Sequence, residues 1–421
     1  MTVRRLAAIV VIFLGTALAW AVLGSSLVAR AGQLDSRLDV EVMQLWGAPQ
    51  RQVAPNAWFL RSVVEREVIE TKDPAGRPVR SEVTKSVNHT IPIALESTRV
   101  NADLGLEHRR KGLLWYSAYT VAFKGTYVFR NPEAAPVDVH FRFPFPADDA
   151  LFDDFVFAVD GRPLALNADV SKDVVATATV AGAAPVTLTV EYTSRGLETW
   201  RYAFVNEGTA QARDVRVTVV TNFHDVDYPA GTVSPSEQVD SGDGRRLTWA
   251  FDNLISGQAI GVQLPQKLNP GPFAARVTFF APVSLLFFFA VVTIVGATYG
   301  PSLHPMHYWF LAAAFFAFHL LLAYLVDHIS VHVAFAVSAL VSLALVVSYL
   351  RLVTGMRHAL TVAGTAQALF LVLFSYAFFF EGFTGLAITI GAILTLFTLM
   401  QMTAHVRWEE VFNREAHHAA R

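Results

Sequence analysis

The segment from Phe279 to Thr403 constrains this chain most strongly, because it consists of five apolar runs separated by short polar breaks. The hydrocarbon core of a bilayer is about 30 Å thick, and roughly 20 apolar residues of helix cross it. The breaks are too short to hold a domain. We therefore predict one bundle of alternately directed membrane helices, at Phe279–Tyr299, Tyr308–Val326, Val331–Leu350, Ala359–Phe380 and Phe383–Thr403.

A sixth apolar run extends from Leu6 to Leu23, directly after Arg4 and Arg5. A cleaved signal peptide would look similar, and Ala29-Arg30-Ala31 offers a small-x-small cleavage pattern. The run is longer than the roughly 7–15 apolar residues of a signal peptide. We therefore predict a retained transmembrane anchor over residues 1–28.

Behind the anchor, apolar residues recur at helical spacing with charged residues between them. This pattern predicts an amphipathic helical extension over residues 29–50, which Gly47 and Pro49 end. The apolar positions are Leu34, Leu38, Val42, Leu45 and Trp46.

From about Trp58 to Pro265 the apolar period changes to two, as in the run from Val137 to Pro146. Such alternation is typical of strands with one buried face. Asp160-Gly161, Asp243-Gly244 and the segment from Lys72 to Gly76 carry turn chemistry. We predict an antiparallel, all-β, sandwich-like domain over residues 51–273, as one sandwich or two abutting ones, with Pro265 to Pro272 as the linker.

Composition excludes several classes of function. The chain has 421 residues, a formal net charge of −2 and no cysteine. The charge gives no basic footprint for nucleic acid, and the missing thiols exclude disulfides and cysteine nucleophiles. The sequence also lacks a Gly-x-Ser-x-Gly elbow, His-Glu-x-x-His, a phosphate loop and a dinucleotide fingerprint. We predict a protein that is not an enzyme and needs no cofactor or metal.

Charge asymmetry predicts the orientation in the membrane. With the N-terminus inside, six spans leave the β domain, Asp327 and Glu381 outside, in agreement with the positive-inside rule. Lys267 and Arg276 lie on the outer side and weaken the match slightly. The arginines that this arrangement puts inside are Arg351, Arg357, Arg407 and Arg414.

These boundaries predict a multi-pass protein of the cell inner membrane with both termini cytoplasmic. Residues 29–273 are then periplasmic, residues 274–404 form a five-helix transmembrane bundle, and residues 405–421 form a cytoplasmic tail.

Four local signatures give the chain a family resemblance. Their order and spacing resemble the CreD family of inner-membrane, cell-envelope-integrity proteins. The matching segments are Trp46-Gly47-Ala48-Pro49-Gln50; Glu107-His108-Arg109-Arg110-Lys111-Gly112 followed by Tyr116 and Tyr119; Leu303-His304-Pro305-Met306-His307-Tyr308; and Asp327-His328-Ile329. The resemblance implies a non-enzymatic role in envelope homeostasis or stress response, often tied to two-component control, and supplies no active site.

The first candidate loop contains His304, Pro305 and His307. Two histidines three residues apart could face one metal, but a third ligand is missing. The alternative is that they end a helix at the cytoplasmic interface and cap or solvate its backbone.

The second candidate loop contains Asp327, His328 and His332 on the predicted outer side. A carboxylate beside an imidazole could titrate near neutral pH and sense acidity. The alternative is a helix boundary with Asp327 in a turn.

Inside the spans, His319 and Gln367 are polar residues at membrane depth, which are often functional. Interhelical hydrogen bonds worth about 1 kcal/mol would explain both.

The functional expectation is a periplasmic β domain that binds an envelope protein or peptidoglycan and is coupled to the bundle in the lipid bilayer. One alternative is a small-molecule or ion transporter or channel, which would need several charged groups at mid-membrane. Another is a membrane sensor subunit of a signalling system.

Overall fold

The structure is a computed structural model that describes residues 3–72, 78–147, 150–164, 173–205, 208–298, 303–380 and 382–404. It divides into two compact units. The membrane unit comprises Met1–Arg37 and Leu268–Arg421, and the β unit comprises Leu38–Lys267. Six described helices are long and apolar enough to cross a membrane. The predicted combination of six spans with a large β-rich region is therefore confirmed, while the predicted tail over residues 405–421 lies outside the described residues.

Helix α1 extends without a break from Val3 to Trp46, so the predicted anchor and amphipathic extension form one element. Within its last turns, Leu38, Val42 and Trp46 are the residues that pack inward, whereas Leu45 is exposed. Spacing of four keeps these three residues on one face of the helix. The helix ends at Gly47, whose φ of +93° a residue with a side chain rarely adopts.

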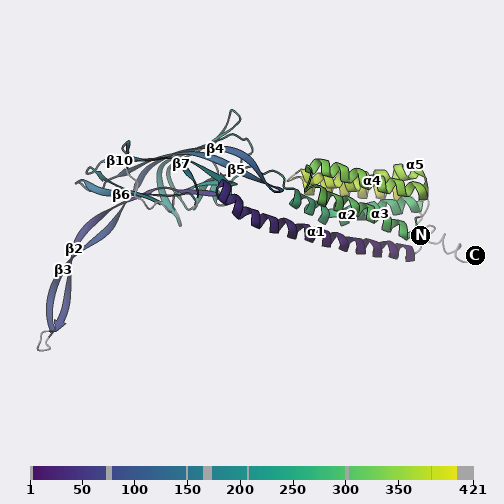
Figure 1. The fold of residues 1–421 in the computed structure, drawn as a ribbon, viewed down its shortest axis with the longest axis horizontal. Coiled ribbons are helices and arrows are strands. Elements are labelled where there is room, and N and C mark those ends of the chain that lie inside the picture. The colour runs from purple at the N-terminus through teal and green to yellow at the C-terminus, as the bar shows by residue number, and fades with distance from the viewer. Residues whose placement is uncertain are drawn as a thin grey trace, which may run out of the picture. The chain divides into compact units, whose positions relative to one another are not determined.

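The other spans follow the β unit in the sequence, as Figure 1 shows for their labelled helices. They are α2 Pro270–Thr298, α3 Pro305–Leu325, α4 Val331–Thr354, a fifth span Met356–Phe379 and α8 Thr384–Thr403. Helix α2 begins at Pro270 rather than at the predicted Phe279, and it takes up the end of the predicted linker. Proline fits the first helical position because its ring fixes a helical φ and its missing N–H has no partner there.

The fifth span is irregular. Its α-helical pieces α5 Met356–His358, α6 Thr365–Gln367 and α7 Phe374–Tyr376 alternate with the π-helical turns η1 Ala359–Gly364 and η2 Ala368–Leu373, and a 3₁₀ turn, η3 Ala377–Phe379, ends it. A π turn displaces the i→i−4 bonds and leaves a carbonyl to be bonded elsewhere. Ser284 of α2 donates a hydrogen bond to the carbonyl of Phe370.

The β unit contains three sheets among its described residues. Their strand orders are β14-β15-β12-β4-β5-β10-β7-β8, β1-β11-β16-β13 and β3-β2-β6-β9. The strands are β1 Gln50–Val53, β2 Asn56–Lys72, β3 Pro78–Ile93, β4 Leu95–Lys111, β5 Leu114–Arg130, β6 Val137–Pro144, β7 Phe152–Val159, β8 Arg162–Pro163, β9 Asp173–Val180, β10 Pro185–Leu197, β11 Thr199–Ala203, β12 Ala210–Thr221, β13 Thr232–Val233, β14 Glu237–Ser241, β15 Gly244–Ser256 and β16 Ala259–Gln263.

One face of the eight-stranded sheet packs against the two smaller sheets. Phe129 of β5 meets Phe141 of β6 edge to face, with ring centroids 5.8 Å apart. Tyr127 of β5 and Tyr202 of β11 bring their hydroxyls within 3.5 Å. Burial raises the pKa of Tyr127 and Tyr202, so both hydroxyls stay protonated at physiological pH. A single continuous core therefore joins the three sheets.

Two details of the β unit differ from the prediction. The pairs β1–β11, β4–β12 and β13–β16 are parallel, so two of the three sheets are mixed. The sheet β3-β2-β6-β9 is purely antiparallel, as predicted. Alternation of apolar residues identifies a strand but not its neighbour, and parallel neighbours need a long crossover connection. The β14–β15 turn has its left-handed residue at Gly242, not at Gly244. Part of the predicted Lys72 to Gly76 turn, residues 73–76, lies outside the described residues.

The end of α1 has its own small core in the β unit. Val42 is fully buried with Leu114, Tyr116, Ala118 and Leu197, and Leu38 and Trp46 pack around them. The last turns of α1 are therefore an integral part of the β unit.

Two valines on α1 test this packing. Val42 is 0% exposed and Val40 is 55% exposed. Both valines lie in α1, so a Val→Ala change at either position has the same effect on helix propensity, and the two changes differ in burial alone. We expect Val42→Ala to lower the free energy of unfolding of the β unit by about 1–3 kcal/mol, and Val40→Ala to stay within about 0.5 kcal/mol. Urea unfolding of the full chain in detergent, followed by tryptophan fluorescence, measures both. Equal losses would contradict the packing of Val42.

Candidate functional site

The two predicted loops lie at opposite ends of α3. The first loop, with His304, Pro305 and His307, lies at its start. Asp327 of the second loop comes two residues after its last residue, Leu325. A 21-residue helix is about 30 Å long. The structure therefore does not bring the two sets of candidate residues together, and each loop has to be considered with its own neighbours.

At the start of α3, the two histidines serve different partners. His304 is the N-cap, and its Nδ1 accepts a hydrogen bond from the N–H of Met306 at 3.3 Å. Pro305 occupies the first helical position. His307 Nδ1 lies 2.7 Å from the Tyr349 hydroxyl of α4. The His304 imidazole therefore caps the start of α3, and the His307 imidazole joins α3 to α4 through Tyr349.

At the other end, Asp327 pairs with a residue of the first span. Nη2 of Arg30 lies 3.3 Å from Oδ2 of Asp327 and donates to the carbonyl of Ala323 at 3.1 Å. The guanidinium also lies 5.7 Å from the centroid of the Tyr324 ring. Carbonyl groups at a helix C-terminus carry partial negative charge, which favours a cation there. Arg30 thus fastens α1 to the end of α3.

The remaining two candidates of this loop go elsewhere. His332 stacks on Phe379 of the fifth span, with ring centroids 4.7 Å apart, and Phe273 of α2 contacts the same phenylalanine ring. His328 is exposed. The carboxylate of Asp327 is therefore paired with an arginine rather than with an imidazole. Within the described ranges, no group of three His, Asp or Glu side chains is placed to hold a metal ion.

The two polar residues predicted at membrane depth, His319 and Gln367, are both fully buried. Nε2 of Gln367 donates to Oγ of Ser342 at 2.7 Å, and Ser342 donates to the carbonyl of Ala314 at 2.6 Å. This network joins the fifth span, α4 and α3, as expected for an interhelical hydrogen bond. His319 differs, because its Nδ1 bonds within its own helix, 3.0 Å from the carbonyl of Phe315. Its ring packs against Trp20 of α1.

In the β unit, the first family signature ends α1 and anchors β1. A Cβ on Gly47 would lie 2.2 Å from the carbonyl oxygen of Arg195, so only glycine allows this close approach. Nε2 of Gln50 donates to Oγ of Ser194 and to the carbonyl of Arg195, both at 2.9 Å. The Trp-Gly-x-x-Gln pattern thus fixes where the chain leaves the helix and enters the sheets.

The second signature lies at the end of the β4–β5 hairpin and holds α1. Lys111 pairs with Glu41 of α1 at 2.6 Å, and Arg109 lies over the ring of Trp46 at 5.7 Å from its centroid. Both cations are partly buried, so the attraction of Lys111 to Glu41 and of Arg109 to the Trp46 ring is stronger than it would be in water.

The same hairpin also holds the segment that leaves the β unit. His108 Nε2 lies 3.1 Å from the carbonyl of Pro265, and Ser117 donates to that carbonyl at 2.6 Å. Lys267 lies over the ring of Trp115 at 4.4 Å. We call the end of the β4–β5 hairpin, His108–Ser117, the clamp, because it grips both chain segments that continue into the membrane unit.

Sequence reasoning missed most of these partnerships. Arg30, Tyr349 and Phe379 belong to other spans than the loops they contact, and no local pattern links them. The clamp could have been suspected, since it coincides with the second family signature and contacts Trp46 of the first.

The fold and these contacts define a multi-pass helical membrane protein with a large inserted β unit. Residues 249–409 match the family model described as "Inner membrane protein CreD". The match confirms the resemblance to the CreD family, whose members are inner membrane proteins. No curated protein matches the chain.

Similarities to solved structures are remote. One is a protein of Legionella pneumophila subsp. pneumophila str. Philadelphia 1, described as a candidate nutrient binding protein, with 14% sequence identity and a TM-score of 0.31. The match covers 47% of this chain and 74% of the Legionella protein. Another is an M1 zinc metallopeptidase of Deinococcus radiodurans, with 12% sequence identity and a TM-score of 0.23. The match covers 76% of this chain and 92% of the metallopeptidase. Scores this low carry no argument about fold or function.

The contacts of Arg30 lead to a ranked prediction. Arg30→Ala removes the ion pair, the bond to the Ala323 carbonyl and the contact with Tyr324, whereas Asp327→Ala removes only the ion pair. We expect losses of about 1–2 kcal/mol for Arg30→Ala and under about 1 kcal/mol for Asp327→Ala.

Thermal unfolding of the full chain in detergent measures both changes, and the exposed neighbour His328→Ala is the matched control. Raising the salt concentration should shrink the effect of Asp327→Ala. A larger effect of Asp327→Ala than of Arg30→Ala would overturn this assignment.

Proposed function

We propose that this chain is a non-enzymatic protein of cell-envelope maintenance whose β unit lies on the outer, periplasmic side of the inner membrane and binds an envelope protein. The observation that carries the proposal is a long two-stranded ribbon, formed by β2 and β3, with two unpaired edges. The clamp and α1 couple occupancy of this ribbon to the bundle.

The orientation is supported by the ends of the spans. One end of the bundle holds the ion pair of Arg30 with Asp327 and the stacked rings of His332 and Phe379. At the other end, where Tyr349 meets His307, Arg351 lies in the last turn of α4 and Arg357 lies in α5. Positive residues favour the cytoplasmic face, so the end with Asp327 is the outer one. Arg407, Arg414 and Glu381 lie outside the described residues.

The ribbon extends beyond the sheet that holds it. Strand β2 pairs with β6 only from Asn56 to Phe59, but it pairs with β3 from Ala57 to Lys72. Among the described residues, β2 beyond Phe59 therefore has one paired edge, as does β3 throughout. The stretch from Leu60 to Lys72 measures about 40 Å at the usual rise of a strand. Figure 1 shows the two strands leaving the rest of the β unit together.

An unpaired strand edge offers a row of backbone N–H and C=O groups that another chain can complete. The ribbon also carries exposed apolar side chains at Leu60, Val63 and Val64. A two-stranded hairpin is marginally stable by itself, so an added strand would stabilise it. A protein segment satisfies these bonds better than a glycan does, which favours an envelope protein over peptidoglycan.

Coupling to the membrane follows from continuity of the chain. Helix α1 has no break between Val3 and Trp46, and the clamp holds both its end and the segment Pro265–Lys267 that leads to α2. A partner that changes the packing of the β unit therefore acts on the two segments that enter the membrane.

Transport through the bundle is the weaker candidate. The fully buried polar side chains of the described spans include His319, Ser342 and Gln367, none of which is an acid, a lysine or an arginine. Transport paths usually gather several charged groups at mid-membrane. Gln367 and Ser342 form hydrogen bonds between helices, and Nδ1 of His319 bonds within α3.

A shortened ribbon tests the proposal. Ser62 and Asn88 are register partners, so joining them through an Asn-Gly turn removes the outer ribbon and keeps its base. We expect stability within about 1 kcal/mol of the parent. The shortened protein should fail to restore resistance to detergent and cell-wall antibiotics in a deletion strain.

A photo-crosslinking residue at Val64 tests the contact directly, with Val239 on the exposed edge strand β14 as the control. An envelope protein captured from Val64 in living cells and not from Val239 supports the proposal. Full activity of the shortened protein, or equal capture from both positions, contradicts it.

A further inference from the structure

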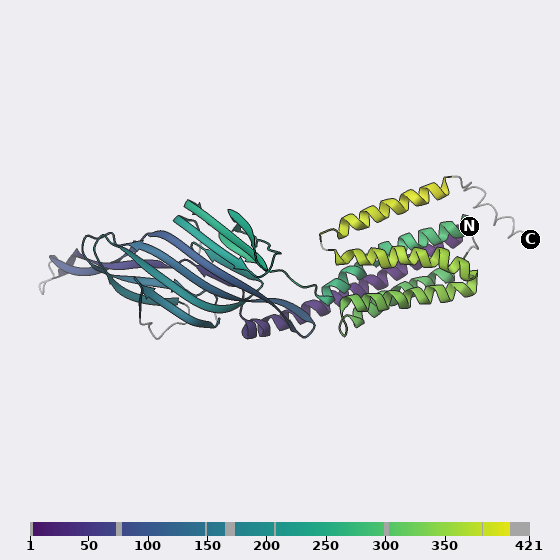
Figure 2. The ribbon, with the colours of Figure 1, turned by 90° about the horizontal axis from the view of Figure 1, so that it is seen from above.

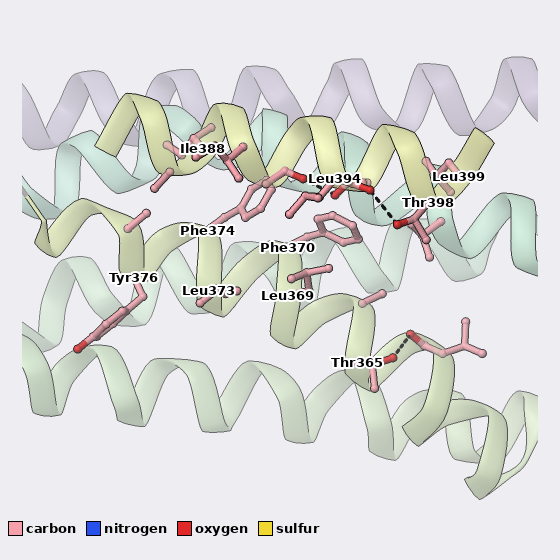
Figure 3. Close-up of a pocket in the computed structure, with 18 of the residues that line it drawn as sticks. Thr365, Leu369, Phe370, Leu373, Phe374, Tyr376, Ile388, Leu394, Thr398 and Leu399 are labelled. Carbon is pink, nitrogen blue, oxygen red and sulfur yellow. Dashed lines mark hydrogen bonds between the residues drawn. The ribbon is translucent and has the colours of Figure 1, made fainter. Parts of the chain in front are cut away.

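The bundle contains an apolar groove between the fifth span and α8. Its volume is about 790 Å3, and Val291 and Val295 of α2 form its floor. Figure 3 shows Phe370 and Phe374 reaching from the fifth span toward α8, with Leu394 of α8 above them. Both walls are helices long and apolar enough to cross the membrane.

The threonines that line the groove do not offer hydrogen bonds to a ligand. Thr361, Thr365, Thr395 and Thr398 each donate their hydroxyl hydrogen to a carbonyl of their own helix, at 2.6–2.8 Å. Figure 3 marks the bonds of Thr365 and Thr398. A hydroxyl has one hydrogen to donate, so these four threonines have none left for an occupant, and the surface around them suits one without acceptor groups. Water gains little in such a cavity.

Helix α8 approaches the rest of the bundle closely at one residue. A Cβ on Gly391 would lie 2.6 Å from Cε1 of Phe374. Of the most apolar window of α8, 6% is buried, against 39–50% for α2, α3, α4 and the fifth span. Figure 2 shows α8, in yellow, along one side of the bundle. In a bilayer, the space beside such a helix is filled by lipid chains.

The length of the groove points to a chain rather than a compact molecule. Its α8 wall runs from Ala387 to Leu399, a rise of about 18 Å for twelve helical steps. One leaflet contributes about half of the roughly 30 Å hydrocarbon core. The π turns η1 and η2 lie on the opposite wall, and such turns are frequent at functional sites.

We propose that this groove binds one acyl chain of a membrane phospholipid, held between the fifth span and α8. The bound chain fills the space on either side of the Gly391–Phe374 contact and joins α8 to the bundle. This inference does not depend on the partner of the β unit.

Two leucines of α8 provide a matched test. Leu394 lines the groove and is 60% exposed, whereas Leu396 is 57% exposed and faces away from it. We expect Leu394→Trp to weaken retention of phospholipid about tenfold, because the indole displaces at least two methylene groups of the chain. Leu396→Trp should retain as much lipid as the parent.

The full chain is purified in mild detergent from a membrane of phosphatidylethanolamine and phosphatidylglycerol, and its mass is measured under native conditions. One retained phospholipid per chain, lost in Leu394→Trp only, supports the proposal. Equal retention in both variants, a retained isoprenoid lipid, or a second copy of the chain instead of a lipid overturns it.

Labelling of the unchanged protein gives an independent reading, should a tryptophan variant fail to fold. A phospholipid with a photoreactive diazirine near the end of one acyl chain should label the groove face of α8, around Leu394 and Thr398. Equal labelling of the outer face, around Ile393 and Leu396, would show bulk lipid and contradict the site.

Discussion

Helix α1 is the constraint on which the other parts of this protein depend, because one unbroken backbone belongs to two different environments. Within the membrane unit, Trp20 packs on Phe316 and His319, and Arg30 fastens the helix to the end of α3. In the β unit, the same helix buries Val42. Its backbone is helical from Val3 to Trp46, so the chain passes from one unit into the other without an intervening loop.

Several polar groups of the bundle follow the rule that polar groups in lipid must be satisfied within the protein, whereas Nε2 of His319 and Oε1 of Gln367 are buried without a hydrogen-bond partner among the described residues. Threonine and serine hydroxyls donate to helix carbonyls, and Gln367 bonds to Ser342 between helices. The π turns of the fifth span obey the same rule, since Ser284 takes up the Phe370 carbonyl. The rest of the interior consists of packed aromatic rings around His319, with the Arg30–Asp327 pair and His307 at the helix ends. That distribution suits a packed structural bundle more than a transport pathway.

The sequence predicted the elements well and their partners poorly. Runs of about 20 apolar residues and period-two alternation are strong local signals. They located the six apolar helices and the β-rich segment, including the strand that begins at Val137. The start of α2 at Pro270 was missed because its first turns are less apolar than the span. The parallel pairs and the Arg30–Asp327 contact join segments far apart in the chain. The irregular fifth span and its groove have no sequence pattern that would reveal them.

The central claim is that the β unit and the Asp327 end of the bundle share the outer side of the membrane. Because the chain has no cysteine, single cysteines can be placed without background at exposed positions: Gly161→Cys in the β unit, Ser330→Cys before α4 and Met356→Cys after it. A membrane-impermeant maleimide applied to cells with a permeable outer membrane and an intact inner membrane should label the first two, and Met356→Cys only after the inner membrane is opened. Labelling of Met356→Cys in intact cells, with protection of Gly161→Cys, would contradict the account.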